Sequence, residues 1–305
     1  MVRINLCSGY RLQGKWSKNS YKIMHLLGEG GIGKVYKAVD IKTHKIWALK
    51  ISNDLQSITK EYEMLKRFRH IGLVPKVKEL DDFYYNNCKL YYIVMEYIEG
   101  KNIKEYIKDQ PINEKASIGL AILIGKIFCI LHKHNFVFGD LKLENLMIDQ
   151  KNNVIKIIDL GGVTPIGSGI KEFTPLYDRA SWDMGLRRAD EGYDLFSLSM
   201  LTIVLLLKGE CISKDMIVDK LLKKLKDIHM SSKLINLIHK GLLQRSITFE
   251  EFLMQLEDIH KRGLYKETRM FRVDKQNMVI NIIFTSSILL FIGMMYKYVG
   301  KSNWF

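Results

Sequence analysis

Residues 136–147 constrain this chain more than any other stretch, because they place three polar side chains of complementary chemistry between two apolar runs. Asp140 is followed two residues later by Lys142 and five residues later by Asn145. A carboxylate can accept a hydroxyl proton, an ammonium can steady a phosphoryl group in transfer, and an amide oxygen can hold a divalent metal ion. The spacing therefore favours phosphoryl transfer, with a solvated loop as the alternative.

Two further segments carry chemistry that fits the first. The apolar residues 155–158 run into Asp159 and Gly161, and a carboxylate at the end of a buried strand is a plausible metal ligand. Near the start of the chain, residues 28–33 form a glycine-rich turn between two alternating apolar segments. Glycines in such a turn let the backbone approach phosphates without a Cβ in the way. A plain glycine-rich hairpin is the alternative.

The order of these segments resembles one family. The glycine-rich turn, the Trp-Ala-Leu-Lys ending at Lys50, the loop around Asp140 and the acid at Asp159 follow the signature set of protein kinases. The chain thus resembles the Hanks-type (eukaryotic-like) protein kinases. A strand-rich half followed by a helix-rich half predicts an α+β, two-lobed protein kinase fold. We expect strands at 21–27, 35–39, 46–51 and 91–96, and helices at 57–69, 113–134, 194–207, 215–227, 232–240 and 248–260.

The resemblance implies a nucleotide site between the lobes, using ATP with Mg²⁺, or Mn²⁺ in its place. Lys50 would bind the phosphates, Met95 would lie behind the adenine, and the backbone of Glu96 and Ile98 would bond its edge. Each apolar member of this set, taken alone, is equally compatible with a core position. The implied ATP-binding residues are Leu27, Gly28, Glu29, Gly30, Gly31, Ile32, Gly33, Val35, Ala48, Lys50, Met95, Glu96, Ile98 and Met147.

The catalytic and metal-binding roles follow in the same way. Asp140 would orient and deprotonate the acceptor hydroxyl, with Lys142 beside it, and Asn145 and Asp159 would hold the metal ion. The lysine's glutamate partner lies in residues 57–69, where Glu61 and Glu63 both qualify. Family spacing selects Glu61 over its neighbour. Thr174 would bond the catalytic Asp and Lys, and together with Lys142 it favours Ser/Thr acceptors over Tyr.

The sequence departs from the family pattern in two places. Phe138-Gly139-Asp140 replaces His-Arg-Asp, so the arginine whose charge an activation-segment phosphate usually neutralises is missing. We therefore expect activity without phosphorylation of that segment. The segment also lacks its usual terminal glutamate, with Arg179-Ala180-Ser181 in its place. Arg245 matches the arginine that pairs with this glutamate, which leaves Asp178 and Asp183 as unranked candidate partners.

The end of the chain predicts a transmembrane helix. Residues 278–296 carry no formal charge and are rich in Ile, Leu, Phe and Met, and about 20 such residues span a bilayer. A buried C-terminal core helix is the alternative. Residues 259–276 hold six Lys/Arg against two in 297–305, which places the kinase on the cytoplasmic side of the cell membrane as a single-pass protein. Polar residues within the span would suit a partner helix in a dimer.

These considerations divide the chain into seven parts. They are a basic N-terminal arm (1–18), an N-lobe (19–95), a hinge (96–100), a C-lobe (101–260), a basic juxtamembrane segment (261–276), a transmembrane helix (277–297) and an external tail (298–305).

Net charge is +14, which favours anionic partners. The basic segments would bind DNA phosphates or anionic lipid, or merely fix the topology. The four cysteines are scattered, as in reduced cytosolic proteins.

Residues 138–142, 158–164, 170–179 and 193–200 are most similar to the tail-anchored Ser/Thr kinases of spore-forming Gram-positive bacteria. The resemblance implies a membrane-anchored Ser/Thr kinase acting on protein substrates, in sporulation or DNA-linked signalling. A different class of function is a catalytically weak kinase-fold scaffold that binds DNA or anionic lipid.

Overall fold

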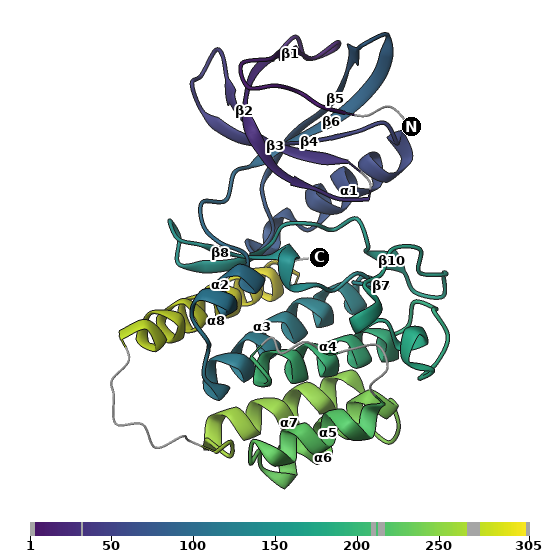
Figure 1. Ribbon diagram of the computed structural model, residues 1–305, viewed down its shortest axis with the longest axis vertical. Coiled ribbons are helices and arrows are strands. Elements are labelled where there is room, and N and C mark those ends of the chain that lie inside the picture. The colour runs from purple at the N-terminus through teal and green to yellow at the C-terminus, as the bar shows by residue number, and fades with distance from the viewer. Residues whose placement is uncertain (1–3, 32, 209–211, 213–216, 267–274, 303–305) are drawn as a thin grey trace.

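The computed structural model describes residues 4–31, 33–208, 212, 217–266 and 275–302. It shows a strand-rich N-lobe above a helical C-lobe, so the predicted α+β arrangement is confirmed (Figure 1). Ile32, predicted to contact ATP, lies outside the described residues, as do Arg269 and Arg272 of the basic segment and the last three residues of the chain.

The N-lobe is one antiparallel sheet of six strands in the order β1-β2-β3-β4-β6-β5, with one helix, α1, beside it. Part of the basic arm is the edge strand β1, and Leu12 in it is buried in the N-lobe core, so the arm belongs to the sheet. Asp54 caps the first turn of α1 by accepting from the backbone amides of Gln56 and Ser57. The elements are β1 (Arg11–Gln13), β2 (Ser20–Glu29), β3 (Lys34–Asp40), β4 (Ile46–Ser52), α1 (Leu55–Arg67), η1 (Arg69–Ile71), β5 (Val77–Tyr85) and β6 (Cys88–Glu96).

The C-lobe is built on two helices, α3 and α4. Both are apolar on nearly all sides, as expected for helices that are buried among other elements. The functional loops of the lobe adjoin two short two-stranded sheets, one that pairs β7 with β10 and one that pairs β8 with β9. The elements are α2 (Ile103–Asp109), α3 (Glu114–Lys133), β7 (Phe136–Val137), η2 (Leu143–Asn145), β8 (Leu146–Asp149), β9 (Val154–Ile157), β10 (Thr164–Pro165), η3 (Pro175–Tyr177), η4 (Arg179–Trp182), α4 (Glu191–Leu206), α5 (Val218–Asp227), α6 (Ser232–Leu243) and α7 (Phe249–Arg262).

The C-terminal helix α8 (Lys275–Ser302) lies along the C-lobe, where it contacts α3, β9 and η1 (Figure 1). One face is buried against the lobe, and the buried Ser287 hydroxyl accepts a hydrogen bond from the Ile155 amide at 3.1 Å. The outward face is apolar as well, with Ile282, Leu289 and Ile292 exposed. Amphipathic surface helices normally present polar residues there.

Within the described part of the chain, α3 is the helix that is long and apolar enough to cross a membrane, and most of it is buried inside the C-lobe. Ile280–Met295 in α8 is a shorter apolar stretch.

Candidate active site

The loop after β7 holds Asp140 in a fixed position between two partners. Its carboxylate accepts from Lys142 Nζ at 3.0 Å and from Thr174 Oγ1 at 2.7 Å. Gly139 before it has φ +80° and lies so close to Gly162 that a Cβ would meet the carbonyl oxygen of that residue at 2.6 Å. Only glycine tolerates both conditions, so the backbone turn that presents Asp140 requires it.

The same loop is fixed from below by a buried carboxylate. Asp194 at the start of α4 accepts from the amide of Phe138 at 2.9 Å and from Gly139 at 3.4 Å. His132 Nε2 lies 2.9 Å from the same carboxylate. Phe138, which replaces the usual histidine, stacks on Phe128 with ring centroids 5.1 Å apart, so an apolar residue fills this place.

A three-membered ion cluster joins the two lobes. Lys50 Nζ on β4 lies 2.6 Å from Glu61 Oε2 on α1 and 3.3 Å from Asp159 Oδ2 after β9. Burial would lower the pKa of Lys50, but the two carboxylates hold it above its ordinary value, so the ammonium is charged. Glu63 is exposed and does not take part, which resolves the alternative between the two glutamates in favour of Glu61.

Asn145 and Asp159 provide the oxygen donors that suit a magnesium ion. The Asn145 carbonyl accepts from the Ile158 amide at 2.9 Å, which places that residue beside the strand end leading to Asp159. Although burial opposes it, Lys50, the Gly161 amide and Lys142 hold the pKa of Asp159 below its usual value, so this carboxylate is ionised. Hard cations such as Mg²⁺ take one or two such protein oxygens and complete their shell with water and phosphate oxygens. The residues therefore fit the ion.

The predicted nucleotide residues lie on β2, β3, β4, β6 and β8 and in the segments that adjoin these strands. Ala48 on β4 is paired with Met95 on β6, and both are buried. The end of β2 and the turn that leads to β3 leave open space beside Gly28, Gly30 and Gly31. A Cβ at Gly33, by contrast, would overlap the Ile51 carbonyl. Of the remaining predicted residues, Leu27 and Glu29 are exposed, Val35 and Met147 are partly buried, and Ile98 is buried.

Sequence reasoning missed the contacts that hold the hinge. Lys37 on β3 lies over the Tyr97 ring at 4.2 Å, and Lys156 Nζ on β9 lies 2.7 Å from Glu96 Oε1. Lys156 and Glu96 are far apart in the sequence, so no local pattern could have identified this pair. Lys60, one residue before Glu61, also donates to the Gly161 carbonyl at 2.8 Å and ties α1 to the segment after Asp159.

The activation segment ends in a clasp that differs from the predicted one. Arg179 is buried and forms a two-pronged ion pair with Asp190, at 2.7 and 2.6 Å, and it also donates to Gln244 at 2.6 Å. Asp178 is buried too, and it binds Arg187 at 2.7 Å and Tyr193 Oη at 2.9 Å.

The prediction that Asp178 or Asp183 pairs with Arg245 is wrong. Arg245 is exposed and forms no ion pair with any described residue, Asp178 is occupied elsewhere, and Asp183 caps η4 at the surface. In place of the usual pair between a glutamate of the activation segment and a later arginine, the segment itself provides the buried arginine, Arg179. The signal was present in the sequence, since Arg179 stands two residues before Ser181, which occupies the position of the missing glutamate.

Comparison with known proteins agrees with this geometry. Residues 21–264 match the protein kinase domain family. The serine/threonine-protein kinase YabT of Bacillus subtilis is 36% identical over 65% of this chain and 59% of its own length. The serine/threonine-protein kinase PrkC of the same organism is 32% identical over 52% of this chain and 25% of its own length. The chain thus spans less than two thirds of either relative.

A solved structure gives the fold independently. The Cydia pomonella granulovirus kinase PK-1 superposes with a TM-score of 0.61 over 77% of this chain and 93% of its own, at 21% identity. With a family match over 244 residues, a Lys–Glu–Asp cluster between two lobes and this fold, the chain belongs to the protein kinase domain family.

Proposed function

We propose that the chain is a protein serine/threonine kinase that transfers the γ-phosphoryl group of ATP to protein hydroxyls. The arrangement around Lys50 carries the proposal, because this lysine contacts Glu61 and Asp159 simultaneously. That contact requires α1 and the end of β9 to occupy the positions in which phosphates and metal can be held together. A scaffold without catalysis has no need of these three charges.

Each residue then has a defined task. Lys50, held by Glu61, binds the phosphates, and Asn145 and Asp159 would hold Mg²⁺, which supplies neutralisation of the phosphate charge. Asp140 accepts the proton of the attacking hydroxyl, and Lys142 stabilises the charge on the group in transfer. Thr174 keeps the Asp140 carboxylate oriented.

The arrangement also supports activity without phosphorylation of the activation segment. The segment is fixed by Arg179 and Asp178 through ion pairs within the protein, and the arginine that a phosphate would neutralise is absent. The test of the proposal is incorporation of phosphate from γ-labelled ATP into a generic basic protein. Asp140→Asn is the control, and equal incorporation by both proteins would contradict the assignment.

We further propose that α8, released from its docked position on the C-lobe, anchors the protein in the cell membrane with the kinase on the cytoplasmic side. Support comes from the uncharged stretch 278–296, from the excess of basic residues before it, and from the apolar outward face at Ile282, Leu289 and Ile292. The role in sporulation or DNA-linked signalling remains a prediction.

The anchor is tested by alkaline carbonate extraction of membranes from cells expressing the full chain or a chain ending at residue 266. The full chain should stay in the membrane pellet and the shorter chain should not. Release of both would refute the anchor without touching the kinase assignment.

A further inference from the structure

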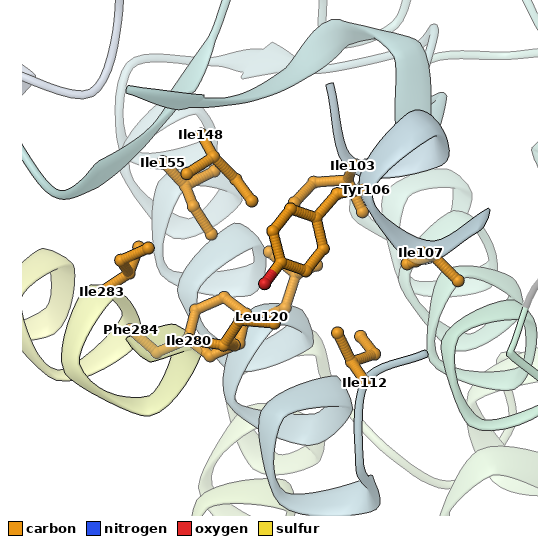
Figure 2. A pocket seen from close by; sticks show the side chains of 10 residues that line it. All are labelled: Ile103, Tyr106, Ile107, Ile112, Leu120, Ile148, Ile155, Ile280, Ile283 and Phe284. Carbon is orange, nitrogen blue, oxygen red and sulfur yellow. The ribbon is translucent and has the colours of Figure 1, made fainter. Parts of the chain in front are cut away.

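The docked helix α8 leaves two cavities along its contact with the C-lobe. The smaller, about 10 Å³, lies between α2, α3 and the first half of α8. In Figure 2 the ring of Tyr106 lies among the apolar side chains that line this cavity, with Ile280, Ile283 and Phe284 of α8 on one side. It has room for about one water molecule and nothing larger.

The second cavity is larger and differs in chemistry. It lies between η1, the end of α3 and the second half of α8, and it measures about 160 Å³. Engineered apolar cavities of about 150 Å³ bind benzene-sized molecules. The lining residues are His70, Ile71, Ile130, Lys133, His134, Phe291, Met294 and Met295. For brevity we call this the α8 pocket.

The walls and the mouth of the α8 pocket have opposite character. Ile71, Ile130 and Phe291 are buried and apolar, whereas Lys133 and His70 are exposed at the rim. None of the eight lining residues is acidic. Partial burial, with smaller contributions from the neighbouring His134 and Arg69, lowers the pKa of His70, so Lys133 supplies the positive charge at the rim.

The pocket depends on the docked position of α8, and one glycine is adapted to that position. Gly72 follows η1 with φ +72°, and a Cβ there would overlap the end of the Met294 side chain. Glycine at this position therefore gives both the turn and the room for Met294. Three of the eight lining residues come from α8, so a molecule in the pocket contacts both the helix and the lobe.

From these observations we infer that the α8 pocket binds the head end of an anionic amphiphile, a carboxylate or phosphate head group with roughly the first six carbons of a single acyl chain, which is what a cavity of about 160 Å³ can enclose. These first carbons fill the apolar interior, and the head group lies at Lys133 with His70 and His134 beside it. Because the ligand touches α8 and the kinase domain together, its binding favours the docked helix over the undocked one. The inference does not depend on phosphoryl transfer.

The direct test uses the full chain in a nonionic detergent with a photoreactive palmitate that carries a diazirine near its carboxylate. After irradiation, mass spectrometry should find adducts on the peptides that contain Ile71 or Met294. Dodecyl phosphate should suppress them, and dodecyltrimethylammonium, with the same chain and the opposite charge, should not. Adducts elsewhere, or equal suppression by both amphiphiles, would overturn the inference.

Two variants and a control test the pocket itself. Lys133→Glu should weaken labelling about tenfold, the effect of a reversed charge at a ligand's head group. Lys223→Glu makes the same change at an exposed lysine on α5 and should leave labelling unchanged. Met295→Trp should block the cavity, with a thermal melt to verify folding. Labelling of Lys133→Glu equal to that of Lys223→Glu would refute the site.

The two sources of such a ligand are separated by competition. Free palmitate is added in one arm, and nanodiscs of phosphatidylcholine with or without phosphatidylglycerol in the other. Suppression by free palmitate alone identifies a free fatty acid, and suppression that requires phosphatidylglycerol identifies a membrane lipid. Suppression by neither contradicts the proposal, and kinase activity is not used as a readout.

Discussion

Replacing Arg179 by alanine should release the end of the activation segment. The guanidinium is buried and donates to Asp190, Gln244 and two backbone carbonyls, those of Leu186 and Arg188. Hydrogen bonds to charged groups contribute about 1.5–3 kcal/mol each when buried. The Asp190 side chain, however, is 44% exposed, so water can replace the arginine there. We therefore expect a loss of about 2–3 kcal/mol for the whole clasp.

For a domain of this size a loss of 1 kcal/mol lowers the melting temperature by about 2–4 °C, so Arg179→Ala should melt about 5–10 °C lower. Thr174, five residues before Arg179, should lose its fixed contact with Asp140, and kcat should fall at least about tenfold through misplacement of the reacting groups. ATP affinity should hardly change, because Lys50 and Asp159 are not touched.

The assay pairs a thermal melt with steady-state kinetics and ATP titration, and its matched control is Arg245→Ala. Because Arg245 is exposed, its replacement by alanine should lower the free energy of unfolding by less than about 0.5 kcal/mol, as surface substitutions usually do. The reasoning is refuted if the two alanine variants melt together, or if Arg245→Ala alone loses activity, as the usual family pairing would require.

Asp140→Asn should lower kcat by about 10²–10⁴-fold, because the group that accepts the hydroxyl proton is lost. ATP binding should be unchanged, because Asp140 makes no contact with the phosphates, and a calorimetric ATP titration beside the kinetics checks both. Treatment with a protein phosphatase should leave activity unchanged, as measured before and after treatment, and a large drop would show that a phosphate is needed. Ser287→Val should destabilise the docked α8 by about 1–3 kcal/mol, since the Ile155 amide is left unpaired, whereas the exposed Thr285→Val should be neutral; hydrogen exchange at Ile155 reports the difference. Although burial opposes it, hydrogen bonds from Arg187 and Ser181 keep the pKa of Asp178 below its ordinary value. The stability that Asp178 gives the folded protein is therefore complete above the unfolded pKa of about 3.9 and is lost as the pH falls through the lower folded value. Asp178→Asn should flatten this acid limb of the curve of stability against pH.

The local arrangement of the candidate reacting groups follows from the sequence, because short spacings within one loop decide it. Asp140, Lys142 and Asn145 lie within six residues, and Lys50 ends a strand whose glycine-rich neighbour is equally local. The predicted helix at 113–134 is observed at Glu114–Lys133, since its apolar pattern is strong and Asn113 caps its start.

What the sequence did not predict depends on contacts across long separations. The pairing of Arg179 with Asp190 and Gln244 joins a loop to the ends of two helices, and no periodic pattern marks it. The burial of Leu12 on β1 depends on a core that later strands form. Gly72 leaves room for the Met294 side chain of the docked α8, more than two hundred residues away, a relation that only the folded structure exposes.

The most direct test of the account is transfer of labelled γ-phosphate from ATP to protein serine and threonine by the full chain, with Asp159→Asn beside it. We predict magnesium-dependent incorporation by the native protein, its loss on chelation, and its loss in the variant, which lacks the carboxylate that pairs with Lys50 and would hold the metal. Incorporation that persists in the variant, or that never occurs with any divalent cation, would contradict the central claim.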